Sequence, residues 1–555
     1  MQRKTFLVLT TLLLLTLLTT SCSIRQTGGF HTPLRFSNVI IYSASDGIHT
    51  VNFEGKDDKL IVLKSDVLKL YDKRGEFNEV TLGNVGISSN GNKLLLSAFF
   101  RKSPQGQTPE ITHSVLFSVD SDGRNLKQLT PENVDFYEKQ ISHDKNLLAF
   151  IGITMDKGEQ KRAIYIVQMD DGKVTRVTPW YYDTTDSNGS TSAGITEFSF
   201  SKDSKKILFV GKSKNGNNYD LNMYNIEKKD LKAIVSDAMG VTIHDWSPDG
   251  KKIAFSVAVS GSHLCPEEKL CVVDSDGSGF KQISREFYYI HSLKWSSDSS
   301  KILFCHFLKP VTIIQGSKNV FLSVVDSNGT AFKEIGGYDI IQGYWAPDGR
   351  RIVAVIGQDI DFALEETTGK QAIYEINIDS MNPMRITPYY ASIEKLILHP
   401  TNSNKIIFTT GIFPYLNTLW MLNLGNRSMQ TIKSFDENQD ITNIVFSPDY
   451  KRYFIRVLKT TFDTTHNLEQ NASLYVYDAN TNALIGKFEG ENEYLTNIEW
   501  IDNQKVCFIK GIMQPGVAEG NFGNLCILDV DSGKTVELTQ ANIDFSYGWW
   551  LAINE

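Results

Sequence analysis

Two histidines and one aspartate are the side chains of this sequence whose types and spacing best fit acid–base or metal chemistry. His244 and Asp245 stand directly before Trp246, and His291 stands four residues before Trp295. A histidine beside a carboxylate can act as a general base or bind a metal ion. Because both histidines precede a tryptophan-containing strand pattern, we expect His244, Asp245 and His291 near one mouth of a shared channel. Their offsets from the tryptophans differ, and histidines used only for packing are the competing interpretation.

Other catalytic patterns do not occur in the sequence. It has no Gly-x-Ser-x-Gly pentapeptide, which holds the nucleophile of α/β-hydrolases, and no Cys-x-x-Cys pair or histidine spacing typical of zinc sites. The repeats described below run almost to the last residue and leave no stretch for a catalytic domain. We therefore expect a protein that is not an enzyme, with no catalytic residues, no metal and no cofactor.

Aromatic side chains recur as short clusters at equivalent places in the sequence. The clusters are Phe136 and Tyr137; Trp180, Tyr181 and Tyr182; Phe287, Tyr288 and Tyr289; and Tyr389 and Tyr390. Each cluster follows a polar strand pattern and precedes an apolar one, so we expect all of them on one face of the fold. Exposed tyrosine and tryptophan offer contact surfaces for a protein or a glycan, and the last three of these clusters are our candidate binding face. Packing between neighbouring repeats is the alternative.

The cysteines suggest two disulfide bonds. Cys265 and Cys271 flank a proline in what the pattern indicates is a hairpin loop. Cys507 and Cys526 lie on strands that we expect to be neighbours. Cys305 has no partner in this scheme, and we expect it to be a buried apolar side chain.

The composition is that of an acidic globular protein. Of its 555 residues, 41% are hydrophobic and 22% are charged, and the formal net charge is -8. These values exclude a disordered or collagen-like chain and argue against a nucleic-acid binder, which needs a basic surface. The 22 tyrosines and 31 phenylalanines favour β-strands.

A repeat supplies the elements that must position these side chains. The segments WSPDGKKIAF from Trp246 and WAPDGRRIVAV from Trp345 each contain an apolar strand, a tight turn and a second apolar strand. Proline, aspartate and glycine are the residues that such turns require. Nine copies lie 46 to 59 residues apart. The equivalent anchor residues are Ser88, Ser142, Ser201, Ser247, Ser296, Ala346, His399, Ser447 and Ile501.

Each repeat continues with a third strand, a hairpin turn and a fourth, more polar strand, and no helical periodicity of comparable length occurs. Four antiparallel strands in about 50 residues make one propeller blade. The sequence therefore predicts an all-β propeller of nine to ten repeats, with tryptophans that pack against the next blade. The first and last strands are expected to share one composite blade and close one large ring. Two rings, or weak repeats that are not blades, are the alternatives.

The repeats over residues 37–555 resemble the TolB-like β-propeller repeat, as WSPDGKKIAF followed by VVDSDGSGFKQIS illustrates. The resemblance implies the fold but not the function. Such repeats occur in colicin-import proteins, in the propellers of peptidases and in sugar-degrading lyases. TolB itself carries a separate α/β domain before its propeller, and we expect no such domain here.

Residues 1–21 resemble a bacterial lipoprotein signal peptide, with a basic start at Arg3 and Lys4 and an apolar stretch that ends before Cys22. The resemblance implies that Cys22 is lipidated and that residues 22–36 are a tether. An ordinary secretory signal is the alternative, and either signal exports the protein. No later apolar run is long enough for a transmembrane helix.

These observations together predict a lipid-anchored protein of the cell envelope, on the periplasmic side or the outer surface. Its propeller is expected to be a non-catalytic protein-interaction or scaffolding module. Its expected partners are envelope proteins and, through the lipid, a membrane, but not a nucleic acid. The alternative is a propeller that binds a glycan or small ligand, or a metal-dependent lyase, acting at the channel mouth.

Overall fold

The structure is a computed structural model, and almost all of its regular elements are β-strands. It describes residues 39–102, 110–185, 191–213, 218–262, 265–307, 320–336, 339–346, 348–358, 370–400, 402, 404–412, 415–462, 468–490, 493–511, 522–539, 543–544 and 552–554. The exception to the strands in this part of the chain is one short helix, α2 (Lys64–Tyr71). Eight residues are too few for a helical period to stand out in a sequence.

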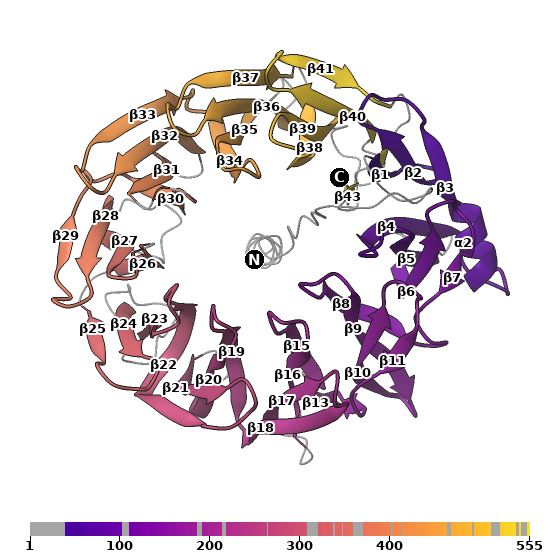
Figure 1. The fold of residues 1–555 in the computed structure, drawn as a ribbon, viewed down its shortest axis with the longest axis horizontal. Helices are drawn as coiled ribbons and strands as arrows, with labels where there is room; N and C mark the ends of the chain where they lie inside the picture. The colour runs from indigo at the N-terminus through magenta and orange to yellow at the C-terminus, as the bar shows by residue number, and fades with distance from the viewer. Residues whose placement is uncertain are drawn as a thin grey trace.

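The strands form antiparallel sheets, most of them four-stranded, that follow one another around a ring (Figure 1). The first strand of each unit is innermost and the fourth is outermost. The first half of the ring contains β4 (Glu79–Ile87), β5 (Lys93–Lys102), β6 (Glu110–Asp120) and β7 (Lys127–Gln128); β8 (Asp135–Ile141), β9 (Leu147–Asp156), β10 (Glu159–Gln168) and β11 (Val174–Arg176); and β15 (Ile195–Phe200), β16 (Lys206–Lys212), β17 (Tyr219–Asn225) and β18 (Asp230–Ala238). Between β11 and β15 lie the short strands β12 (Tyr181–Tyr182), β13 (Thr184–Thr185) and β14 (Thr191–Ser192).

The second half of the ring continues in the same way. Its sheets are β26 (Asp339–Trp345), β27 (Arg351–Gln358), β28 (Lys370–Asn377) and β29 (Pro383–Arg385); β30 (Ser392–Leu398), β31 (Lys405–Ile412), β32 (Tyr415–Asn423) and β33 (Met429–Ser434); β34 (Gln439–Phe446), β35 (Arg452–Phe462), β36 (Leu468–Asp478) and β37 (Leu484–Glu489); and β38 (Tyr494–Trp500), β39 (Lys505–Gly511), β40 (Phe522–Asp529), β41 (Lys534–Glu537) and β42 (Ile543–Asp544). The last strand, β43 (Ala552–Asn554), pairs with β1 (Val39–Ser43) in a sheet with β2 (Gly47–Asn52) and β3 (Lys59–Leu63).

Two consecutive units share one continuous strand. Their sheet contains β19 (Gly240–Trp246), β20 (Lys252–Ser262), β21 (Cys265–Asp274), β22 (Lys281–Trp295), β23 (Lys301–Phe307), β24 (Val320–Asp326) and β25 (Lys333–Ile335). The sequence predicted two separate strands where β22 lies. No glycine or proline interrupts β22, and the change of direction is made by bulges at Tyr289 and Ser292, whose φ angles are 47° and 58°.

The turn between the first two strands confirms the predicted turn chemistry and adds a role for the anchor serine. The fully buried Ser247 hydroxyl donates to the Asp249 carboxylate at 2.7 Å and accepts from the Lys252 amide at 2.9 Å. Gly250 has a φ of 68°, which glycine adopts without strain. The repeat anchored at Ala346 has no hydroxyl, and there the Asp348 carboxylate accepts at 3.1 Å from the Arg351 amide, the equivalent of the Lys252 amide.

The four tryptophans that stand before an anchor contact the preceding unit of the ring, so the predicted direction is wrong. The Trp246 indole donates to the Ser199 hydroxyl at 3.2 Å, and the Trp500 indole donates to the Val445 carbonyl at 3.2 Å. Both acceptors lie on the innermost strand of the sheet before. The hydrophobic core is likewise divided among sheet interfaces, as where Leu208 of β16 and Phe255 of β20 share one cluster.

Both predicted disulfides are wrong. Cys265 and Cys271 lie on the same strand, β21, and six residues of strand separate their α-carbons by about 20 Å, far beyond disulfide reach. Cys507 is opposite Ile527 in the ladder while Cys526 is opposite Phe508, so the two cysteines point to opposite faces of the sheet. Cys271, Cys507 and Cys526 are free and buried.

The expectation for Cys305 is confirmed, because its thiol is free and buried. Cys22, together with the predicted signal peptide and tether, lies outside the described residues. Within the described part of the chain, no helix has the length and apolar character needed to cross a membrane.

Candidate functional site

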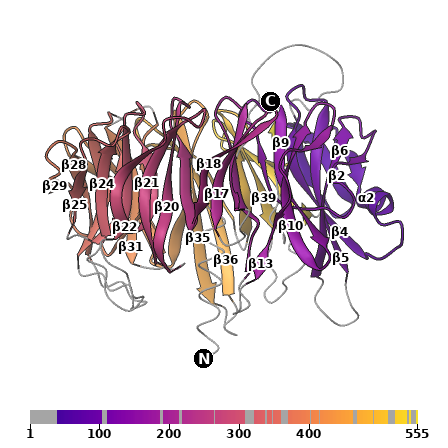
Figure 2. The ribbon, with the colours of Figure 1, turned by 90° about the horizontal axis from the view of Figure 1, so that it is seen from below.

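The two ends of the ring differ in what they carry (Figure 2). We call one end the loop face: it carries the β9–β10 hairpin and the described parts of the connection between β11 and β15, residues 177–185 and 191–194. We call the other end the turn face: it carries the anchor turns, such as residues 247–252. Neighbouring strands of a sheet run antiparallel, so the hairpins between second and third strands lie on the loop face with the connections between sheets. All of the predicted aromatic clusters therefore belong to the loop face.

Much of the predicted aromatic face is packed between sheets. Phe287 is only 1% exposed, and its ring lies 3.8 Å from that of His306. Tyr390 contacts Trp420, with ring centroids 5.7 Å apart. The Tyr389 hydroxyl lies within hydrogen-bonding distance of another tyrosine hydroxyl, and Tyr288 is half-buried. Phe287 packs between the two units that share the seven-stranded sheet, and Tyr390 packs between two sheets.

The cluster beside β10 is partly packed in the same way. The Trp180 ring meets Tyr165 edge-on at 6.2 Å, and the Tyr181 ring meets Phe209 edge-on at 5.8 Å. The register pairs Tyr181 with Arg162 and Tyr182 with Lys161. The connection that follows β11 is thus attached to the end of β10 as a fifth strand, β12, which the sequence did not reveal.

Three large side chains remain exposed around this hairpin. The exposed fractions are 64% for Tyr137, 63% for Met155 and 42% for Tyr182. We call these three residues the β9–β10 rim. The Arg162 guanidinium lies over the Tyr137 ring at 5.2 Å, and the Lys161 ammonium lies over the Tyr182 ring at 5.9 Å. Exposed Tyr and Met on a fixed backbone are typical of surfaces that bind proteins.

Charged groups beneath the rim pair with one another. Asp183 is 3% exposed, and its carboxylate accepts from the Arg162 guanidinium at 3.0 Å and from the Gly194 amide at 2.6 Å. Asp156, nearer the surface, accepts from Lys161 at 2.7 Å. The ion pair with Lys161 lowers the pKa of the Asp156 carboxyl. These cations and carboxylates hold the backbone and the rings in place.

The residues predicted at the channel mouth form no catalytic cluster among the side chains that the structure describes. The backbones of His244 and His291 lie on neighbouring innermost strands, β19 and β22, and both histidine side chains lie outside the described residues. Asp245 is half-buried, and its backbone carbonyl accepts from the Trp295 indole at 3.4 Å. Among the side chains that the structure describes, no three His, Cys, Asp or Glu residues are grouped so that they could hold a metal ion.

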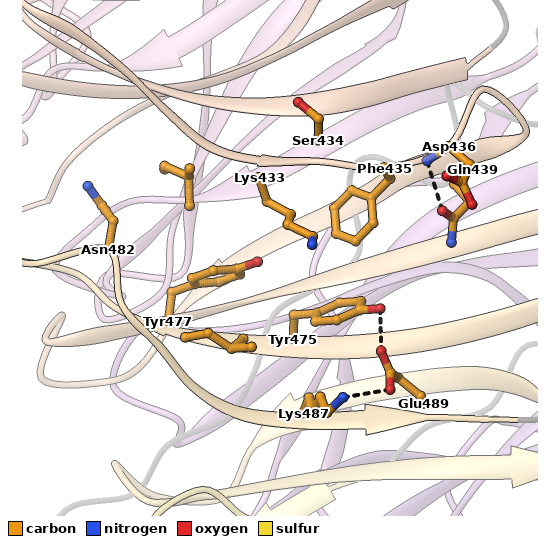
Figure 3. Close-up of a pocket in the computed structure, with 12 residues that line it drawn as sticks. Lys433, Ser434, Phe435, Asp436, Gln439, Tyr475, Tyr477, Asn482, Lys487 and Glu489 are labelled. Atoms are coloured by element: carbon orange, nitrogen blue, oxygen red, sulfur yellow. Dashed lines mark hydrogen bonds and ion pairs between the residues drawn. The ribbon is translucent and has the colours of Figure 1, made fainter.

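A hollow of about 510 Å³ lies between the outermost strands of two neighbouring sheets, β33 and β37 (Figure 3). This β33–β37 hollow was not predicted from the sequence. It is lined by Ile432, Lys433, Ser434, Phe435, Asp436, Gln439, Tyr475, Tyr477, Asn482, Leu484, Lys487 and Glu489. Tyr475 and Tyr477 stand two residues apart on β36, so the sequence could show that their side chains share one face of the strand. The sequence could not show which residues of the adjacent sheet would lie opposite that face.

These sheets and their arrangement define the class of protein: the chain is a β-propeller. No family model matches the sequence, and no curated protein matches it.

Solved structures with a similar fold are of different kinds. A structure described as the eukaryotic initiation factor aligns over 93% of this chain and 98% of its own, with 13% identity and a TM-score of 0.46. An oligogalacturonate lyase in complex with manganese aligns over 73% and 98%, with 15% identity and a TM-score of 0.36. TolB from Acinetobacter baumannii aligns over 62% and 77%, with 17% identity and a TM-score of 0.27. At these TM-scores, none of the likenesses carries an argument about what this chain binds.

Proposed function

We propose that this β-propeller is a non-catalytic protein-interaction module of the cell envelope, and that it binds its partner through the β9–β10 rim. The single observation that carries the proposal is the exposure of Tyr137, Met155 and Tyr182 together at one end of one sheet. Large apolar and aromatic side chains that are already ordered lose little conformational entropy on binding. They are therefore suited to the centre of an interface.

The chemistry of the rim supports binding rather than catalysis. The two cations and two carboxylates beneath the rim form the ion pairs Arg162–Asp183 and Lys161–Asp156. A general acid or base must be able to reach a substrate proton, whereas these groups hydrogen-bond to each other. They hold Tyr137 and Tyr182 at the loop-face end of the sheet.

The proposal includes a single closed ring of ten blades, in which β22 serves two blades and β43 completes the blade of β1. The antiparallel pairing of Ile40 with Ile553 supports this closure, because it joins the two ends of the chain in one sheet. A closed ring has no free sheet edge at the junction and fixes the rim relative to the rest of the molecule.

The proposal also includes export and lipid anchoring through Cys22, on the sequence features of residues 1–21. Mass spectrometry of the N-terminal peptide from the native envelope tests this part. A diacylated or triacylated cysteine as the first residue is the expected result. A chain that begins elsewhere, without lipid, would remove the anchor and leave the rim proposal standing.

The binding proposal is tested with tagged full-length protein in detergent-solubilised envelope. The variant Tyr137→Ala/Tyr182→Ala removes the exposed rings, and Tyr450→Ala removes an equally exposed tyrosine from the turn face. We expect one or more envelope proteins to co-purify with the unmodified chain and with Tyr450→Ala, and to be lost from the rim variant. A rim variant that is folded and retains the same partners would contradict the proposal.

A further inference from the structure

We propose that the β33–β37 hollow binds a neutral sugar ring. This inference goes beyond the protein-interaction function, because the hollow lies on the outer side of the ring, on different sheets from the β9–β10 rim (Figure 1). Its volume of about 510 Å³ falls within the range of small-molecule sites. Three features of its lining suit a sugar: an aromatic floor, free hydrogen-bond donors and balanced charge.

Aromatic rings form the floor of the hollow. Tyr475 and Tyr477 come from β36, and Phe435 faces them from the neighbouring sheet, with 5.2 Å between the ring centroids of Phe435 and Tyr475 (Figure 3). Tyr475 is 8% exposed and Tyr477 is 3% exposed, so neighbouring side chains fix both rings. A rigid apolar floor suits the C–H face of a sugar ring.

Amide groups on two sides of the hollow keep donors that are not used by the described residues. The Gln439 side-chain oxygen accepts from the Asp436 amide at 3.0 Å, which leaves its Nε2 group available. The Asn482 side-chain oxygen accepts from the Tyr453 hydroxyl at 3.4 Å, which leaves its Nδ2 group available. Each amide is thus fixed by its oxygen while its nitrogen can donate to a ligand hydroxyl.

The charges around the hollow balance. Lys433 and Lys487 are positive and Asp436 and Glu489 are negative, so the lining has no net charge at neutral pH. Glu489 accepts from Lys487 at 2.8 Å and from the Tyr475 hydroxyl at 2.9 Å, and these hydrogen bonds lower the pKa of its carboxyl. An anion or a cation would each meet a like charge, whereas sugar hydroxyls can both donate and accept. This balance is why we infer a neutral sugar.

A second hollow provides a matched comparison. It measures about 290 Å³ and is lined by Lys205, Lys206, Met223, Asn225, Glu227, Lys228, Asp230, Lys232 and Asp276. It also lies between two sheets and mixes lysines with carboxylates, but its lining contains no aromatic ring. Asn225 lines this hollow as Asn482 lines the first, and its side-chain oxygen likewise accepts a hydrogen bond, here from the Lys228 amide. We assign no ligand to this hollow.

The test is calorimetric titration of the full-length protein with maltotriose, cellotriose and chitotriose. Gln439→Glu and Asn482→Asp each keep the accepting oxygen, replace the donor with a second acceptor and add a negative charge, while Asn225→Asp makes the same change in the second hollow and so controls for the added charge. We expect saturable binding of at least one of these sugars. We expect each variant of the β33–β37 hollow to weaken it about tenfold, the usual effect of one lost hydrogen bond, and Asn225→Asp to leave it unchanged.

Two results would overturn the sugar proposal. One is no saturable binding of any of the three trisaccharides to the unmodified protein. The other is binding that Gln439→Glu and Asn482→Asp leave unchanged. The Tyr137→Ala/Tyr182→Ala variant separates the two proposals, because it should bind the sugar normally while it loses the protein partner.

Discussion

The buried ion pair under the β9–β10 rim gives the sharpest prediction about what holds the proposed binding surface in place. Replacing Asp183 with alanine removes the carboxylate that accepts from Arg162 and from the Gly194 amide. Arg162 is 14% exposed, so its guanidinium would be left largely buried without its partner. Breaking a buried pair in this way costs about 3 to 5 kcal/mol, and the residual exposure of Arg162 places this case near 3.

Hydrogen–deuterium exchange measures this loss of local stability in the segment where it occurs. A local destabilisation of about 3 kcal/mol speeds exchange through local opening on the order of a hundredfold. We expect that acceleration in peptides that cover residues 177–194 and the end of β10. The matched control is Asp156→Ala, which breaks the more exposed pair with Lys161 and the 3.3 Å hydrogen bond from the Tyr182 hydroxyl, and should accelerate exchange in 177–194 far less than Asp183→Ala does.

The reasoning about the rim fails if Asp183→Ala changes exchange in 177–194 by less than about threefold. It also fails if Asp156→Ala accelerates exchange as much as Asp183→Ala does. Either result would mean that something other than the buried pair holds the connection that carries Tyr182.

Three further predictions concern stability and reactivity. Cys271, Cys507 and Cys526 are buried and free, and burial raises the pKa of each thiol, so iodoacetamide should label them only after unfolding, as counted by mass spectrometry. Burial raises the pKa of Glu499 to about 7, above its value of 4.5 in an unfolded chain, so its stabilising effect is complete below pH 4.5 and is lost as the pH rises through 7. Glu499→Gln should therefore be more stable than the unmodified protein at pH 8, with the difference shrinking towards pH 4.5, as urea unfolding at several pH values would measure. Ser247→Ala should cost about 1 kcal/mol in the same assay, because it removes a buried hydroxyl that joins both sides of the anchor turn.

The strands and their antiparallel pairing were predictable because each anchor turn has a chemical signature. A serine, an aspartate and a glycine at fixed spacing, as at Ser247, Asp249 and Gly250, specify where two strands meet. Local hydrogen bonds determine these features, and the residues that form them are adjacent in the sequence.

Features that depend on neighbouring sheets were not predictable. The tryptophans were assigned to the wrong neighbour, because nothing in the sequence says on which side of a sheet the next sheet lies. The pairing of Cys507 with Cys526 failed for a related reason, since a shift of one residue in the register puts the two side chains on opposite faces. The β33–β37 hollow combines residues from β33, β36 and β37 and has no local signature.

The aromatic clusters include both a ring that is exposed, as predicted, and rings that are packed. Phe287 and Tyr390 are packed between neighbouring units of the ring, whereas Tyr182 is exposed, although all three follow the same kind of polar strand. Tyr182 remains exposed because β12 pairs with the end of β10 and holds it there. That pairing depends on residues twenty positions apart, and the sequence pattern does not encode it.

The measurement that tests the central claim most directly is photo-crosslinking in living cells, with benzoylphenylalanine in place of Tyr182 or, as control, of Tyr450. The account predicts a discrete crosslinked envelope protein from position 182 and none of the same mass from position 450. The same adducts from both positions, or none from position 182 in a chain that reaches the envelope, would contradict the claim that the β9–β10 rim is a protein-binding surface.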